Sequence, residues 1–112
     1  MTNPVSLLAD IPEQSCTELF STLLHHKHCR IERIVSFGQA SPEGFWYDQA
    51  WDEWVLLVQG SAELDLGGQT LALSPGDHVF IQAGQRHRVL RTSSTPPAIW
   101  LAVHLEAQAT TA

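Results

Sequence analysis

The sequence predicts an all-β domain, an antiparallel sandwich or barrel preceded by a short helix. From Arg30 onward, side chains alternate with a period of two, which is the pattern of β-strands. These short strand-like segments are separated by Gly, Pro, Ser and Asp at regular intervals, as in sandwiches and barrels. No helical pattern lies between the segments, which excludes a fold that alternates strands with crossover helices.

Length and composition indicate one globular domain. The chain has 112 residues, of which 44% are hydrophobic and 16% charged, which is enough to form a core and too apolar for disorder. The formal net charge is −6 without any basic cluster, so nucleic acid and anionic membranes are not expected partners. The sequence begins without a basic region and apolar run, and it has no stretch of about 18 apolar residues, so we expect a cytoplasmic protein.

Residues 1–29 form an N-terminal arm in which we expect a helix. Ser15 followed by Glu18 has the spacing of a helix capping box. Four apolar residues then follow at helical spacing: Leu19, Phe20, Leu23 and Leu24. These features predict a helix from about residue 12 to residue 26, packed on the outside of the barrel.

The end of this arm concentrates potential metal ligands. His25, His26, His28 and Cys29 lie within five residues, so a metal site or a reactive thiol is one interpretation. Consecutive side chains diverge on any regular element, and such a run rarely closes around one ion. The favoured interpretation is therefore a solvated loop after the helix.

Residues 30–106 form the predicted barrel, and residues 107–112 a flexible tail. The pair Gly67-Gly68 is a strong signal for a two-residue hairpin, and the sequence from Ser74 to Asp77 has the composition of a β-turn. The expected strands cover residues 30–37, 53–59, 62–66, 71–73, 78–81, 87–90 and 99–105.

Two local motifs identify a resemblance to the cupin family. The first is Glu53, then six residues, then Gly60; the second combines Pro75-Gly76-Asp77, Ala83-Gly84 and His87. Their arrangement over residues 44–91 is similar to the two conserved cupin motifs. The resemblance implies an antiparallel jelly roll, also called a double-stranded β-helix, that encloses a pocket for a small molecule and pairs as a homodimer.

The resemblance also suggests which residues carry chemistry. Metal-binding cupins hold one divalent ion with two histidines and a glutamate of the first motif and a histidine of the second. Glu53 and His87 match two of these positions, which makes them candidate metal ligands and the best candidate catalytic residues. A glutamate and a histidine facing each other in an apolar interior can also exchange protons near neutral pH.

The paired histidines of the first motif are missing. Their positions fall on Trp46 and Asp48 under one spacing and on Tyr47 and Gln49 under the other. Asp48 or Gln49 can supply an oxygen ligand, whereas Trp46 and Tyr47 are poor substitutes for imidazole. The implied cofactor is therefore one weakly held ion of Mn, Fe, Ni or Zn, or none at all.

Four further residues are candidates for the pocket wall. Trp46 and Tyr47 are either an aromatic wall for a planar ligand or part of the core and the dimer interface. Alternation places Arg91 on the face of His87, where it can bind a ligand carboxylate or pair with an acid. His104 lies on the last strand, whose nearly continuous apolar pattern leaves open which face points inward.

Three functions follow from these candidates. The first is a metal-dependent enzyme in which Glu53, His87 and an oxygen ligand hold the ion. The second is a metal-free module that binds or senses a small molecule through Trp46, Tyr47, Glu53 and His87. The third is a structural homodimer without catalysis, because one fold hosts many functions.

Overall fold

The computed structural model describes residues 2–107, and within that range it consists of β-strands and irregular segments without a helix. No helix in this part of the chain could therefore span a membrane. The strands are β1 (Leu19–His26), β2 (Cys29–Ser36), β3 (Asp52–Gln59), β4 (Ala62–Leu66), β5 (Gln69–Leu73), β6 (His78–Ile81), β7 (His87–Thr92) and β8 (Ala98–Leu105).

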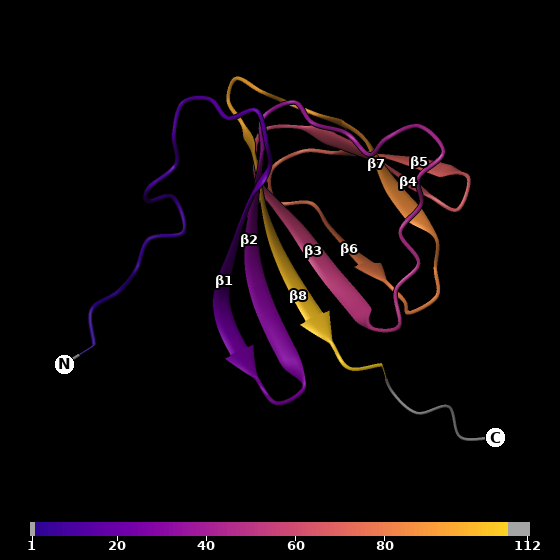
Figure 1. Ribbon diagram of the computed structural model, residues 1–112, viewed down its shortest axis with the longest axis horizontal. Coiled ribbons are helices and arrows are strands. Elements are labelled where there is room, and N and C mark those ends of the chain that lie inside the picture. The colour runs from indigo at the N-terminus through magenta and orange to yellow at the C-terminus, as the bar shows by residue number, and fades with distance from the viewer. Residues whose placement is uncertain (1, 108–112) are drawn as a thin grey trace.

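The strands form two antiparallel sheets, shown in Figure 1. The larger sheet has the order β1-β2-β8-β3-β6 and the smaller one the order β5-β4-β7. Chain neighbours are often not sheet neighbours, because β8 returns to lie between β2 and β3. This arrangement confirms the predicted all-β cupin barrel.

Alternation along the strands explains which side chains form the core. In β3, Glu53, Val55 and Leu57 are buried, while the residues between them are partly exposed. β8 is central in the larger sheet, and its Trp100 lies opposite Ile34 of β2 and Leu57 of β3. β8 is hydrogen-bonded along both edges, and its residues Ala98, Ile99, Trp100 and Ala102 are buried, which accounts for much of its apolar sequence.

The helix predicted for residues 12–26 was wrong, because residues 19–26 form the edge strand β1. β1 pairs with β2 and places Phe20 opposite Ile34. The apolar residues of this segment therefore belong to an edge strand, not to one face of a helix. A bulge between Thr22 and Leu24 interrupts the period of two. The leucines therefore fall at a spacing that also suits a helix.

The two residues of the apparent capping box serve other purposes. The hydroxyl of Ser15 accepts a hydrogen bond from the backbone nitrogen of Thr17 at 3.2 Å, which forms a local turn. The carboxylate of Glu18 instead accepts a hydrogen bond from the hydroxyl of Ser36 on β2. The local spacing of Ser15 and Glu18 thus favours a helix, but pairing of the segment with β2 places it in a sheet.

The arm before β1, drawn in indigo in Figure 1, has no regular structure but is attached to the larger sheet. The buried guanidinium of Arg33 donates hydrogen bonds to the carbonyl oxygens of Leu7 at 3.0 Å and Ala9 at 2.6 Å. Arg33 thereby connects two residues of the arm to the middle of β2. At the other end of the chain, most of the expected tail, residues 108–112, lies outside the described residues.

The run of histidines lies at the hairpin between β1 and β2. Lys27 and His28 form the turn, and the ring of His28 contacts the carboxylate of Glu106. Cys16 and Cys29 are free thiols. Among residues 2–107, no three His, Cys, Asp or Glu side chains are grouped so that they could hold a metal ion.

Candidate functional site

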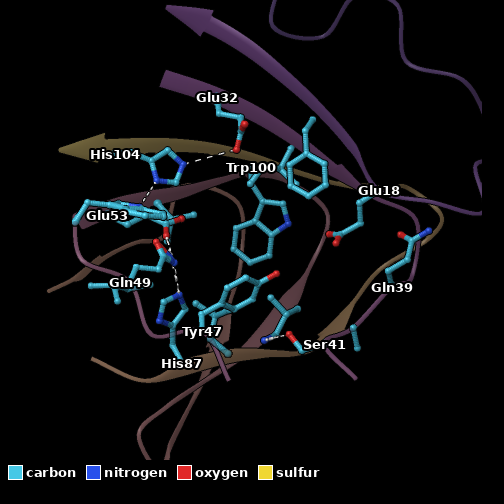
Figure 2. Close-up of a pocket in the computed structure, with 18 of the residues that line it drawn as sticks. Glu18, Glu32, Gln39, Ser41, Tyr47, Gln49, Glu53, His87, Trp100 and His104 are labelled. Atoms are coloured by element: carbon cyan, nitrogen blue, oxygen red, sulfur yellow. Dashed lines mark hydrogen bonds and ion pairs between the residues drawn. The ribbon is translucent and has the colours of Figure 1, made fainter. Parts of the chain in front are cut away.

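A cavity of about 320 Å³ lies between the two sheets, at the lower end of the size range of small-molecule sites. Its wall comes from both sheets and from the β2–β3 loop, residues 37–51. Figure 2 shows the rings of Tyr47 and Trp100 in the middle, with polar side chains on either side. Other apolar lining residues are Phe20, Ile34, Ala40, Pro42, Val55, Leu64, Ile81 and Val89.

At one end of the cavity, Gln49 bridges Glu53 and His87. The amide nitrogen of Gln49 lies 3.2 Å from Oε1 of Glu53 and 3.3 Å from Nε2 of His87. These latter two atoms are themselves 4.0 Å apart. Figure 2 shows the carboxamide between its two partners. The three side chains come from the β2–β3 loop, β3 and β7, so the fold brings together residues far apart in sequence.

The hydrogen bonds of His87 define its tautomer. Its Nδ1 lies 3.0 Å from the carbonyl oxygen of Gln85, which can only accept, so Nδ1 carries the proton. Its Nε2 then offers a lone pair to the amide of Gln49. The ring of Tyr47 stacks on His87 at a centroid distance of 5.3 Å, and the two backbones exchange hydrogen bonds of 2.7 and 3.1 Å. This pairing attaches the β2–β3 loop to β7.

The environment of Glu53 favours its protonated form. Burial raises the pKa of Glu53 to about 7, the carboxylate of Glu32 acts in the same direction, and the guanidinium of Arg30 opposes both. The pKa of Tyr47 is also raised, first by burial and then by Glu18 and Glu53, so its hydroxyl stays neutral. The site therefore holds a carboxyl group that exchanges its proton near neutral pH.

A second glutamate and histidine pair lines the same cavity. Nε1 of Trp51 donates to Nδ1 of His104 at 2.8 Å, so the proton of the neutral imidazole is on Nε2. That Nε2 lies 3.7 Å from Oε1 of Glu32, and it is buried without a hydrogen-bond partner among the described residues. Burial lowers the pKa of His104, Arg30 lowers it further, and Glu32 opposes them.

Sequence reasoning missed several lining residues. Glu32 is one of them: it lies on β2 between Ile31 and Arg33, and nothing in that local pattern indicates that its side chain faces the cavity. Trp51 is another, and it lies at the cavity beside His104. Glu18 and Gln39 also line the cavity, but they come from the arm and the loop, where no periodicity indicates direction.

The structure distinguishes the two possible spacings of the first motif. Tyr47 and Gln49 line the cavity, whereas Asp48 is exposed outside it. Trp46 is also outside the set of lining residues, and its ring lies 5.0 Å from the guanidinium carbon of Arg86. Tyr47 and Gln49 are thus the residues at the positions of the missing histidines.

Arg91 lies away from the cavity, contrary to the face that simple alternation predicts. β7 and β4 change register because Glu63 pairs with Arg91 whereas Leu64 pairs with Val89, so one residue of β7 bulges. His87 and Val89 consequently line the cavity, and Arg91 is exposed at the surface. Its guanidinium lies 3.9 Å from the carboxylate of Glu63 in an exposed ion pair.

The residues at the metal position of cupins do not fit a tightly bound divalent ion. They supply one imidazole, one carboxyl, one phenol and one carboxamide, where a strong site needs more imidazole, thiolate or carboxylate groups. The amide of Gln49 also donates toward the carboxylate oxygen and the imidazole nitrogen whose lone pairs an ion would need. The donor set therefore favours a hydrogen-bonded network over metal coordination.

Comparison with known proteins agrees with this fold. Residues 37–104 match the family described as the cupin domain. A solved structure from Ralstonia eutropha JMP134, provisionally named a mannose-6-phosphate isomerase, is 45% identical with a TM-score of 0.91, covering 95% of this chain and all of that one. A cupin superfamily protein from Desulfitobacterium hafniense DCB-2 is 19% identical with a TM-score of 0.77, covering 94% of this chain and 92% of that one, and shows the fold alone.

A curated relative shares a shorter region. The 3-hydroxyanthranilate 3,4-dioxygenase of Homo sapiens is 32% identical over 63 residues, which are 56% of this chain. The match spans only 21% of the dioxygenase.

Proposed function

The chain belongs to the cupin domain family, and we propose that it binds a small organic molecule inside the barrel without a resident divalent metal. The observation that carries this proposal is the carboxamide of Gln49 between Glu53 and His87, at 3.2 and 3.3 Å. It connects directly the two residues that match ligand positions of the cupin motifs. In a metal-binding cupin, the corresponding side chains would bind an ion.

The cavity supplies what a ligand site needs. Apolar and aromatic walls give most of the contact area, and a few polar groups at the ends can orient a ligand. Glu53 can donate or accept a proton near neutral pH, because its pKa is raised to about 7. We therefore propose that Glu53 is the residue that exchanges a proton with the bound molecule. Gln49 and His87 hold the carboxyl group of Glu53 in place.

The cavity lining does not suit the substrates that the names of the relatives imply. Mannose 6-phosphate and 3-hydroxyanthranilate are both anions, and binding sites for such groups usually contain Arg or Lys. Among the described residues that line the cavity, none is Arg or Lys. The short match to the dioxygenase leaves most of that enzyme without a counterpart here.

Pairing of two chains stays a prediction. Large apolar side chains are exposed on the edge strands β1 and β6, including Leu24 at 48% and Phe80 at 49%. Surfaces of this kind are typical of interfaces. Light scattering during gel filtration distinguishes a homodimer from a monomer.

The test of the proposal measures ligand binding with and without metal. Amide spectra of ¹⁵N-labelled protein are recorded with a library of small aromatic compounds, before and after treatment with a chelator that is then removed. Bound compounds should shift the amide signals of Gln49, Glu53 and His87, and chelation should leave their affinities unchanged. Loss of binding after chelation, or hits only at surface residues, would contradict the proposal.

A gain-of-metal variant sharpens the test. The double variant Tyr47→His, Gln49→His places imidazoles at both positions that line the cavity, and we expect it to retain about one Zn²⁺ or Ni²⁺ per chain. The matched control is Trp46→His, Asp48→His, which adds the same two residues outside the cavity lining. Elemental analysis of both variants and of the wild type measures the amount of metal bound per chain. A near-stoichiometric ion in the wild type would refute metal independence.

A further inference from the structure

The cavity wall contains acidic side chains but no lysine or arginine among the described lining residues. The acidic residues are Glu18, Glu32 and Glu53. The guanidinium of Arg30 acts electrostatically on Glu53, but Arg30 lines a neighbouring cavity beside the β1–β2 hairpin. A ligand that reaches the cavity therefore meets carboxyl groups without meeting a cation.

One buried hydrogen-bond acceptor at the Glu53 end also lacks a donor. The side-chain oxygen of Gln49 is buried and has no hydrogen-bond partner among the described residues. Glu53 is only 9% exposed, and its Oε1 interacts with the amide nitrogen of Gln49. A buried acceptor without a donor destabilises the folded state, so a ligand that brings donors to this end would offset that cost.

The rings beside these acceptors suit the same ligand chemistry. Tyr47 and Trp100 lie between the Glu53 end and the Glu18 end of the cavity in Figure 2. The faces of aromatic rings attract cations, and their surfaces pack against apolar groups. An ammonium group has three donors and no acceptor, which matches carboxyl and carboxamide oxygens.

We infer that the cavity binds an organic amine, with the ammonium group at Glu53 and Gln49 and an apolar or aromatic body between Tyr47 and Trp100. The inference rests on the proposed function, because it names the class of ligand for the same cavity. It extends that function by predicting that a cationic ligand binds more tightly than a neutral or anionic one of similar shape.

The test compares three probes of similar shape and different charge at pH 8. These are 2-phenylethylamine as the cation, 2-phenylethanol as the neutral compound and 3-phenylpropanoate as the anion. Affinities are measured by titration of the amide spectrum. The amine should bind about ten times more tightly than the alcohol, because a charge-assisted hydrogen bond contributes more than a neutral one, and the anion should bind least.

Two variants test whether the tighter binding of the amine depends on Glu53. Glu53→Gln should weaken binding of the amine about tenfold and change binding of the alcohol less than about twofold, since only the charge is removed. The matched control Asp48→Asn removes one negative charge outside the cavity lining and should leave all three affinities unchanged. If Asp48→Asn weakens the amine as much as Glu53→Gln does, the preference comes from the net charge of the chain and the inference fails.

The remaining outcomes separate this inference from the proposed function. Tightest binding of 3-phenylpropanoate, or equal binding of amine and alcohol in the cavity, overturns the amine inference and leaves a small-molecule site in place. Failure of all three probes also overturns the inference. In that case the wider library, recorded with and without chelator, decides the proposed function by itself.

Discussion

The two glutamate and histidine pairs of the cavity resemble each other in composition but differ in how they are connected. Glu53 and His87 approach to 4.0 Å, and Glu32 and His104 approach to 3.7 Å. All four side chains are at least 85% buried, with exposures of 7% to 15%. The first pair shares the amide of Gln49, whereas Nε2 of His104 has no hydrogen-bond partner among the described residues.

The two histidines are held by different numbers of hydrogen bonds, although each lies close to a glutamate. His87 is held through both ring nitrogens, by Gln85 and by Gln49. His104 is held through only one of its nitrogens, by Trp51. A ring held at one nitrogen can turn when a ligand arrives, so we expect the first pair to define the site and the second to adapt to its contents.

The largest effect is expected from Glu53→Gln on the pH dependence of stability. The folded carboxyl has a pKa of about 7 and the unfolded one its ordinary value of 4.5, so the folded state binds more protons between these values. Wild-type stability should therefore fall as pH rises from 4.5 through 7 and then level off. At pH 8 the variant should be more stable than wild type by up to about 3 kcal/mol.

Urea unfolding at pH 5 and pH 8 measures this effect, with the partly exposed Glu63→Gln as the control. The advantage of Glu53→Gln should shrink toward pH 5, and the control should show no such trend. An advantage that is equal at both pH values would show that Glu53 is not buried as a protonated group. It would also remove the reason to treat the first pair as the proton-exchanging one.

A smaller effect is expected from Gln49→Leu, which removes the bridge of the first pair. Oε1 of Glu53 and Nε2 of His87 would then lose a shared donor, at a cost of about 1 to 3 kcal/mol in the free energy of unfolding. Urea unfolding measures the change against Gln82→Leu, a substitution of an exposed glutamine. Equal stability of the two variants would mean that the bridge contributes no more than a surface amide.

The smallest effect is expected from Trp51→Phe in the second pair. The variant removes the donor to Nδ1 of His104 and should cost about 1 kcal/mol. Ring nitrogen chemical shifts should place the proton of wild-type His104 on Nε2 and show a mixture of tautomers in the variant. Trp54→Phe, whose ring packs against His78 instead, is the control. A wild-type proton on Nδ1 would contradict the assigned hydrogen bond.

The first pair could be predicted from the sequence, and the second could not. Glu53 and His87 belong to local motifs whose turns and spacings are readable along the chain. Glu32 and His104 meet only because β8 lies beside β2, a pairing that depends on the order of strands in the sheet. The orientation of His104 was also open, since apolar residues alternate onto both faces of residues 98–105.

The other differences have local causes that sequence patterns do not show. Alternation placed Arg91 in the cavity, but the bulge in β7 reverses the direction of the side chains after Val89. A capping motif and four apolar residues predicted a helix where the edge of β2 accepted a strand. In both cases the decisive interaction is with a partner strand distant in sequence.

The attachment of Arg33 to the arm has a consequence for where this domain begins. A shortened chain that started at residue 30 would retain the cupin motifs and lose both the edge strand β1 and the carbonyl groups of Leu7 and Ala9. The guanidinium would lose both of these acceptors, and β2 would become an unpaired edge of the larger sheet. The irregular first residues thus stabilise the larger sheet, and we expect the smallest stable unit to extend well beyond the two cupin motifs.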